Sequence, residues 1–148
     1  MTVYKRPVSV LVVIHTPELR TLLLERRLHP GYWQSVTGSQ EEGESLIACA
    51  AREVEEETGI AASESDFSDW QVTNTFEIFA EWRHRYAPGI TRNSEHVFSL
   101  EVAQVLPVNI APDEHLSYLW LPWREAAKKC FSWSNRDAIL MLPEKTAH

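Results

Sequence analysis

The chain has 148 residues, of which 44 % are hydrophobic and 24 % are charged. This balance is typical of a folded protein and excludes the apolar-poor composition of disorder. The length favours one domain, residues 1–148, because no repeat, low-complexity tract or flexible linker marks a boundary. The net charge of −7 argues against binding of nucleic acid through bulk positive charge. An acidic chain can still bind small polyphosphates through a metal ion.

We expect neither a membrane-spanning segment nor an export signal in this sequence. The apolar run Val10–Ile14 is far below the roughly 20 residues of a membrane helix, and Met1–Pro7 contains no apolar segment. We therefore expect a cytoplasmic protein without an obligate protein partner. Cys49 and Cys130 lie outside any metal-ligand spacing, so we expect two small buried hydrophobes and neither a disulfide nor a zinc site.

The N-terminal third predicts a pair of strands. Val8–Ile14 is nearly continuously apolar and rich in β-branched residues, which is typical of a strand covered on both faces. After Pro17 the chain resumes with three leucines, so Val8–His15 and Thr21–Arg26 are expected to pair antiparallel across a short loop. A further short extended segment is expected at Trp33–Val36.

A central helix is predicted at Ser45–Thr58. Its apolar residues fall on one stripe, as in an amphipathic helix: Leu46, Ile47, Ala50 and Val54. Gly59 follows directly and supplies the residue that commonly ends a helix.

The middle of the chain predicts two more strands. We expect Gln71–Tyr86 to be extended, and its alternation would place Arg83 and Arg85 on one strand face. The turn at Pro88-Gly89 should lead into a return strand over His96–Val102.

The C-terminal third predicts a short strand and a short helix. The strand is expected at Tyr118–Leu121, and Ser134 with Asp137 forms a variant capping box that predicts the start of the helix at Ser134. Strands interspersed with helices favour an α/β protein in which helices flank a mixed sheet.

An acidic pattern spans the loop before the central helix and the helix itself. It consists of Gly38, Glu44, Arg52-Glu53-Val54, Glu56-Glu57 and Gly59-Ile60, with gaps of five, seven, one and one residues. This pattern resembles the Nudix box at every defined position. At ordinary residue frequencies of about 6–7 %, it would arise by chance in such a chain on the order of once in 10⁷. The resemblance implies a Nudix-type α/β/α sandwich with a mixed central sheet, and metal-dependent hydrolysis of a diphosphate bond.

The spacing of the glutamates has a physical reason of its own. Glu53, Glu56 and Glu57 stand at i, i+3 and i+4 on one helix face, where each like-charged pair costs roughly 0.2–0.5 kcal/mol. A divalent cation would turn this repulsion into attraction, and ligands without Cys or His favour Mg²⁺ or Mn²⁺ over zinc. The alternative is a solvated acidic face.

Three other residues of the pattern support this cluster. The guanidinium of Arg52 could orient a carboxylate, the alternative being an ordinary surface ion pair. Glycine at position 38 permits close approach of the backbone to a metal or a phosphate. The resemblance implies that the Gly38 carbonyl is a metal ligand and that Glu44 anchors the loop to the helix.

A triphosphate also needs cations outside the box. We rank Lys5 and Arg26 first, and regard Arg83, Arg85 and Arg92 as a second group whose alternative is a solvated strand face. In Glu114 the resemblance implies an additional metal ligand or general base, the alternative being a surface glutamate, while His115 is expected to be structural. Candidates for stacking on a heterocycle, with core packing as the alternative, are Trp33, Phe76 and Phe79.

Segments outside the box are similar to bacterial Nudix hydrolases that act on dihydroneopterin triphosphate: Tyr4–Ser9, Trp33–Ser39, Phe76–Phe79, Arg83–Gly89 and Ser132–Arg136. This resemblance implies release of pyrophosphate from 7,8-dihydroneopterin triphosphate in folate biosynthesis. The implied catalytic and metal-binding residues are Gly38, Arg52, Glu53, Glu56, Glu57 and Glu114. The implied substrate contacts are Lys5, Arg26, Thr37, Phe76, Glu77, Ile78, Phe79 and Ser132.

Two other functions remain open. A general (deoxy)nucleoside triphosphate pyrophosphatase, acting for example on dATP, is the second candidate, because pterin and purine rings have similar shapes. A Nudix-fold binding module without turnover is the third, but such a module would be expected to have lost one of the glutamates, and all are present.

Overall fold

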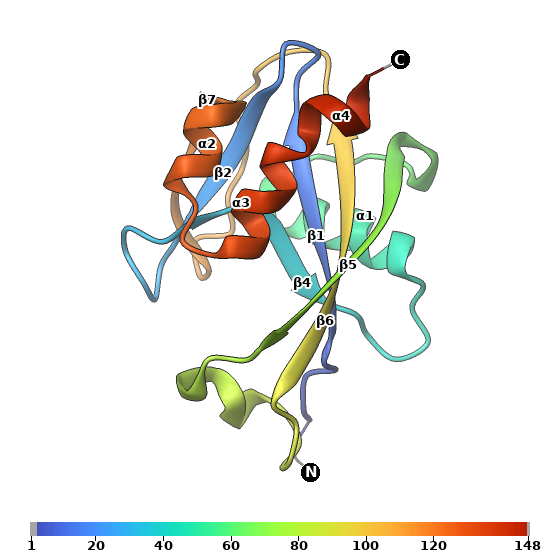
Figure 1. Cartoon of the computed structure of the whole chain (residues 1–148), viewed down its shortest axis with the longest axis vertical. Helices are drawn as coiled ribbons and strands as arrows, with labels where there is room; N and C mark the ends of the chain where they lie inside the picture. The colour runs from blue at the N-terminus through green and yellow to red at the C-terminus, as the bar shows by residue number, and fades with distance from the viewer. Residues whose placement is uncertain (1–2, 148) are drawn as a thin grey trace.

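A central β-sheet lies between two helical layers (Figure 1). The computed structural model describes residues 3–147, so Met1, Thr2 and His148 of the expected 1–148 domain lie outside the described residues. Helix α1 packs on one face of the sheet, and α2, α3 and α4 pack on the other. The expected α/β/α sandwich is confirmed.

In residues 3–147 the sheet has seven strands. They are β1 (Val8–His15), β2 (Arg20–Arg26), β3 (Trp33–Gln34), β4 (Val36–Ser39), β5 (Phe67–Glu77), β6 (Arg92–Glu101) and β7 (His115–Pro122). β1 runs parallel to β6 and antiparallel to β4, whereas β2 is antiparallel to β3 and β7, so the sheet is mixed as predicted.

The predicted pairing of the first two strands is confirmed, although it is short. β1 and β2 pair at His15 and Thr21, and β4 then occupies the place beside β1 from Val12 to Ser9. β4 carries Gly38 and Thr37, so this change of partner brings the start of the acidic pattern against the middle of the sheet.

β1 is buried on both faces, as its apolar sequence predicts. Val10, Val12 and Ile14 pack beneath α1, whereas Leu11 and Val13 pack beneath the C-terminal helices. Each such side chain contributes about 1.5–3 kcal/mol when fully buried. The strand therefore fixes both helical layers relative to the sheet.

Helix α1 (Leu46–Thr58) has the predicted ends. The Ser45 hydroxyl accepts the N–H of Ala48 at 3.2 Å, and Gly59 closes the helix with φ of 77° while its N–H donates to the Glu55 carbonyl at 2.9 Å. A left-handed residue at this position is cheap only for glycine. The caps fix the rotation of the helix and hence the face that carries the glutamates.

The expected strand at Gln71–Tyr86 is wrong in its second half. β5 ends at Glu77, opposite Arg92, where β6 begins, so residues beyond Glu77 have no partner strand. Ala80–Arg85 instead forms the 3₁₀ helix η2, in which the Trp82 N–H donates to the Phe79 carbonyl at 2.8 Å. Arg83 and Arg85 therefore do not share a strand face.

The other predicted strands are present and longer than expected, since β6 begins before His96 and β7 extends Tyr118–Leu121 at both ends. The expected extended segment at Trp33–Val36 divides between β3 and β4. Cys49 is buried, as expected, and Cys130 is partly buried.

The C-terminal region contains more helix than predicted. Its helices are α2 (Trp123–Lys129), α3 (Trp133–Leu140) and α4 (Leu142–Thr146). Outside this region, a 3₁₀ turn, η1 (Glu64–Asp66), precedes β5. The predicted cap at Ser134 is wrong, because the Ser132 hydroxyl accepts the N–H of Asn135 and α3 starts earlier. Within residues 3–147, no helix is both long and apolar enough for a transmembrane span.

Candidate active site

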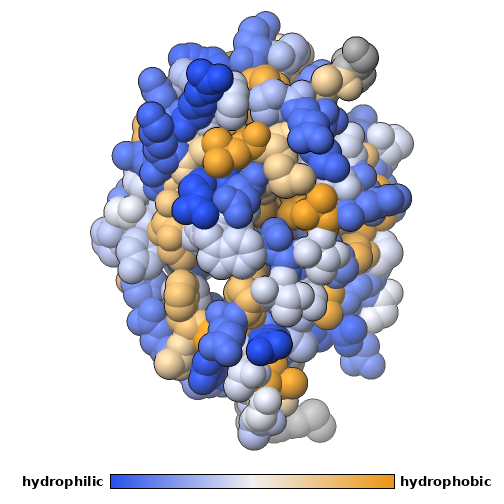
Figure 2. Space-filling view, in the orientation of Figure 1, coloured by the Kyte–Doolittle hydropathy of each residue, from blue (hydrophilic) through white to orange (hydrophobic). Residues whose placement is uncertain are grey.

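A cleft of about 870 Å³ runs across the end of the sheet. On the face shown in Figure 2 the surface is hollowed between η2 and the start of α3. Every predicted site residue lines this cleft: Lys5, Arg26, Thr37, Gly38, Arg52, Glu53, Glu56, Glu57, Phe76, Glu77, Ile78, Phe79, Glu114 and Ser132. The fold therefore brings together segments from the N-terminus, three strands, α1 and three loops.

Arg52 links the loop before α1 to the helix. Its guanidinium donates to Glu44 at 2.7 Å and to Glu53 at 2.9 Å, and a weaker ion pair reaches Glu56 at 3.3 Å. The bond from Arg52 lowers the pKa of Glu44 to about 2. Glu44 also accepts the backbone N–H of Glu41 at 3.0 Å, which is the geometry expected of a loop anchor.

Gly38 leaves room for the Glu53 carboxylate. A Cβ added at position 38 would overlap that carboxyl group, so a side chain at this position would displace it. Burial raises the pKa of Glu53, while Arg52 opposes this shift. The close approach brings the β4 backbone and a carboxylate of α1 to the same point.

Glu57 is the most deeply buried carboxylate of the acidic face, with 1 % of its surface exposed. Its Oε2 has no hydrogen-bond partner within residues 3–147, and its Oε1 lies 3.6 Å from Nε2 of His115. Burial raises the pKa of Glu57 well above its ordinary value. Burial and the charge of Arg26 lower the pKa of His115 to about 4, so this imidazole is neutral near pH 7 and does not compensate Glu57.

These residues fit a divalent cation. Ligand atoms of Glu57, Glu114 and His115 lie within 4.8 Å of one another, and the orphaned oxygen of Glu57 lacks a positive partner. A bound cation would satisfy that oxygen and remove the repulsion between the carboxylates. His115 enters this group although the sequence favours a structural role for it.

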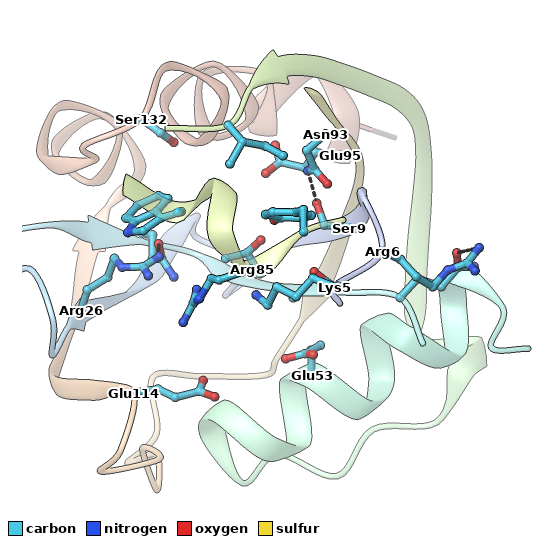
Figure 3. A pocket seen from close by; sticks show the side chains of 18 of the residues that line it. Lys5, Arg6, Ser9, Arg26, Glu53, Arg85, Asn93, Glu95, Glu114 and Ser132 are labelled. Atoms are coloured by element: carbon cyan, nitrogen blue, oxygen red, sulfur yellow. Dashed lines mark hydrogen bonds between the residues drawn. The ribbon is translucent and has the colours of Figure 1, made fainter. Parts of the chain in front are cut away.

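Three cations face the same space. Figure 3 shows Lys5, Arg26 and Arg85 between the acidic side of the cleft and its opposite wall. Burial lowers the pKa of Lys5 and of Arg26, and the charge of Arg85 lowers both further. Mutual repulsion of this kind is relieved by an anion. We call these three residues the cationic band.

The second group of predicted arginines divides. Arg85 lines the cleft, whereas Arg83 and Arg92 do not contribute to its lining among the described residues. Arg83 donates to the Ile78 carbonyl at 3.0 Å and lies 3.8 Å from Glu77. Arg85 is held by its backbone, because its carbonyl accepts the N–H of Lys5 at 2.8 Å.

The aromatic candidates also divide. Phe76 and Phe79 line the cleft, where Phe79 packs edge to face against Trp82 with ring centroids 5.0 Å apart. Trp33 instead packs into the core beneath the C-terminal helices, and the ammonium of Lys129 lies 5.2 Å from its ring centroid. Trp33 is therefore a partly buried packing residue outside the cleft lining.

Sequence reasoning missed the wall of the cleft opposite the glutamates. Ser9, Asn93 and Glu95 form this wall, and all three are buried. The sequence does contain a signal for this wall. Asn93 and Glu95 stand two residues apart in β6 and fall on the same strand face as the buried Val97. Two polar residues on the inward side of a strand depart from ordinary core composition.

An acidic group that fits a metal ion, beside cations that line the same cleft, is the arrangement of an enzyme that hydrolyses phosphate compounds with a metal. The model of the NUDIX domain family matches residues 5–142 of the chain. The chain therefore belongs to the Nudix family, and its box residues occupy one side of the cleft.

Two relatives and one solved structure are similar over nearly the whole chain. Dihydroneopterin triphosphate diphosphatase of Escherichia coli K12 is 51 % identical over 93 % of this chain and 92 % of its own length. The Haemophilus influenzae protein of the same name is 40 % identical over 94 % of this chain and 89 % of its own length. The structure of E. coli dihydroneopterin triphosphate pyrophosphohydrolase matches with a TM-score of 0.86 and 50 % identity, covering 93 % of this chain and 95 % of that one.

Proposed function

We propose that this chain hydrolyses 7,8-dihydroneopterin triphosphate to the monophosphate and pyrophosphate, a reaction of folate biosynthesis. The observation that carries the proposal is one cleft in which the cationic band faces the acidic group of the Nudix box. Relatives at 51 % and 40 % identity bear the name of this activity. The chain is a Nudix pyrophosphohydrolase, and the pterin substrate is the specific part of the proposal.

Glu53, Glu57 and Glu114 would hold the metal, with Glu56 and the Gly38 carbonyl beside them. Oxygen ligands favour Mg²⁺, with Mn²⁺ as a substitute. When bound, the cation supplies an activated water molecule and neutralises phosphate charge. Arg52 keeps Glu53 and Glu56 in place through its two ion pairs.

The cationic band would bind the phosphate oxygens and orient the chain of phosphates toward the acidic group. Attack of water on the phosphorus nearest the pterin side chain breaks the bond to the next bridging oxygen, so pyrophosphate leaves. Phe76–Phe79, Thr37 and Ser132 would contact the remainder of the substrate. The Thr37 hydroxyl already donates to the Val10 carbonyl at 3.0 Å, so it is oriented before the substrate binds.

A direct comparison of dihydroneopterin triphosphate with dATP, each with Mg²⁺, tests the proposal. We expect a higher kcat/KM for the pterin compound and release of pyrophosphate. A preference for dATP would favour the second candidate, a general nucleoside triphosphate pyrophosphatase. Orthophosphate as the first product, without an added pyrophosphatase, would contradict the site of attack. Excess EDTA should abolish turnover, and full activity in EDTA would contradict the role of the metal.

The proposed partner is a small-molecule triphosphate, consistent with an acidic protein that holds its cations inside a cleft. A single domain over residues 1–148, a cytoplasmic location and the absence of an obligate protein partner stay predictions.

A further inference from the structure

The wall of the cleft opposite the glutamates is built from two neighbouring strands. Ser9 of β1 lies beside Glu95 in the parallel register, and Asn93 precedes Glu95 by two residues on the same side of β6. Their exposed fractions are 6 %, 4 % and 4 %. We call these three residues the polar wall. Its position on strands and its burial make it a rigid surface.

The polar wall contains two acceptors without partners. The Asn93 amide donates to the Ser9 hydroxyl at 2.8 Å, but Oδ1 of Asn93 and Oε1 of Glu95 have no hydrogen-bond partner in the described part of the chain. A buried polar group left unsatisfied costs about 1–3 kcal/mol. These two acceptor atoms therefore lack donors, and a ligand with N–H groups would supply them.

The neighbouring elements satisfy only part of the Glu95 carboxylate. Ser134 of α3 and Asn74 of β5 form side-chain hydrogen bonds with it, but its Oε1 has no partner among the described residues. Asn135 of α3 also lines the cleft, but its Oδ1 accepts the N–H of Ser35 at 2.8 Å and its Nδ2 donates to the Ser132 hydroxyl at 2.9 Å. Both ends of that amide are thus engaged within the protein. Oδ1 of Asn93 and Oε1 of Glu95 therefore stay unpartnered among the described residues.

The polar wall lies where the non-phosphate part of a substrate must lie. Figure 3 shows Asn93 and Glu95 on one side of the cationic band and Glu53 and Glu114 on the other. A triphosphate held by the band and the acidic group therefore extends its organic part toward the wall. Phe76 and Trp133, with ring centroids 6.5 Å apart, line the same cleft and offer apolar surface for a flat ring.

We propose that Glu95, assisted by Asn93, selects substrates whose ring carries an amino group next to a ring N–H. A carboxylate accepts from both donors of that edge, which occurs in the 2-amino-4-oxo rings of pterins and of guanine. In adenine the ring nitrogen beside the amino group carries no hydrogen and is itself an acceptor. One carboxylate oxygen would therefore face this nitrogen without a hydrogen bond. This inference rests on the proposed function, because it assigns the specificity of the same cleft.

The carboxyl group of Glu95 is suited to accept two N–H donors from a ring. Burial raises the pKa of its carboxyl group to about 7. Two N–H donors from a ligand favour the ionised form of the carboxyl group and offset the unfavourable free energy of its burial. A water-exposed carboxylate would gain less from the same contacts, because it would first have to release its water.

The variant Glu95→Gln tests the proposal with little change in shape. Glutamine presents one acceptor and one donor, which suits the amino group and bare nitrogen of adenine and opposes the N–H of guanine. We expect the ratio of kcat/KM for dGTP to that for dATP to fall by about 10–100-fold. Inhibition by inorganic tripolyphosphate should stay within about twofold of the wild-type value, because the cationic band is unchanged.

Two further variants sharpen the test. Glu101→Gln changes an exposed carboxylate at the other end of β6, outside the cleft, and should leave the dGTP-to-dATP ratio unchanged. Asn93→Ala removes the second open acceptor and should lower the same ratio by about 3–10-fold. If Glu95→Gln fails to fold, the Asn93 variant keeps the proposal testable.

Binding of neopterin, which has no phosphate, separates this inference from the proposed function. Calorimetry should show at least about tenfold weaker binding to Glu95→Gln than to the wild type. Such a result would support the polar wall even if dihydroneopterin triphosphate were not hydrolysed, an outcome that overturns only the proposed function. Unchanged neopterin affinity and an unchanged dGTP-to-dATP ratio would overturn the inference, while hydrolysis of the triphosphate would stand.

Discussion

Glu57 and Glu95 stand on opposite sides of one cleft, and each is a carboxylate withdrawn from water, with 1 % and 4 % exposed. Burial raises the pKa of both. Their neighbours differ. Glu57 shares its space with other carboxylates and the neutral His115. The neighbours of Glu95 are uncharged: Ser9 lies beside it on β1, and Asn74 and Ser134 form side-chain hydrogen bonds with it.

The difference shows that burial alone does not define the function of a carboxylate. Several acidic groups that share one space call for a concentrated positive charge, which a divalent cation supplies. One carboxylate among neutral polar groups needs a pair of N–H donors, which a heterocycle supplies. The same desolvation therefore prepares one side of the cleft for a metal and the other for a ring.

The largest expected effect is on the acidic side. Glu57→Gln removes a proposed metal ligand, so turnover should fall by about 10²–10³-fold, as in comparable electrostatic sites. The metal-free protein should be equally stable or more stable, because one buried charge is gone. Steady-state kinetics at saturating Mg²⁺ and melting in EDTA measure the two effects.

Glu55→Gln, on the exposed side of α1, serves as the control for Glu57→Gln and should retain activity. Wild-type turnover by Glu57→Gln, or its unfolding without metal, would contradict the role of Glu57.

A smaller loss is expected from Gly38→Ala. The added Cβ would displace the Glu53 carboxylate, and a shift of about 1 Å costs up to about 10²-fold in rate. The displaced group is the end of a flexible side chain, so the melting temperature should change little. The variant should therefore lose activity, while its melting curve stays close to that of the wild type. A large loss of stability with unchanged turnover per folded molecule would mean that the glycine serves the fold.

Glu44→Gln should lower stability without removing a metal ligand. The carboxyl pKa is about 2 in the folded protein and about 4.5 unfolded, so its contribution is complete above pH 4.5 and is lost as pH falls toward 2. At pH 7 we expect a loss of about 1.5–3 kcal/mol, typical of a hydrogen bond between charged groups. Urea unfolding of both proteins at pH 7 and pH 3 should show the difference shrinking. An equal difference at both values would contradict the ion pair as its source.

The smallest expected effect concerns the stability of the polar wall. The carboxyl pKa of Glu95 is about 7 when folded and about 4.5 unfolded, so the folded protein binds more protons between these values and loses stability as pH rises through them. Glu95→Gln removes this loss. Between pH 4 and pH 8 the free energy of unfolding of the variant should rise relative to that of the wild type by on the order of 1 kcal/mol. This value allows for the unpaired amide that the glutamine itself introduces. Thermal melting across that range measures it, and parallel curves would contradict it.

The acidic side of the cleft could be predicted from sequence because its information is local. Ser45 and Gly59 define the ends of α1, and the 3.6-residue period then places Glu53, Glu56 and Glu57 on one face. The pairing of Arg52 with Glu44 follows from the same stretch of chain once the helix is fixed. Neither conclusion depends on distant residues.

The polar wall could not be predicted in this way. Ser9 and Glu95 meet because β1 and β6 pair in parallel, and nothing near either residue specifies that register. The end of β5 at Glu77 likewise depends on where β6 begins, so alternation alone extended the predicted strand too far. At α3, Ser132 and Ser134 are both plausible caps by residue type, and packing of the helix decides between them.

The bridge between Lys5 and Tyr86 makes the beginning of the described chain part of the cleft wall. Helix α4 lies toward the opposite end of the molecule from that N-terminal segment (Figure 1). The two ends of the chain are therefore unequal sites for attachment. A purification tag, fluorophore or surface linker joined after α4 leaves the route of the substrate open, whereas the same group joined just before Lys5 would stand beside it.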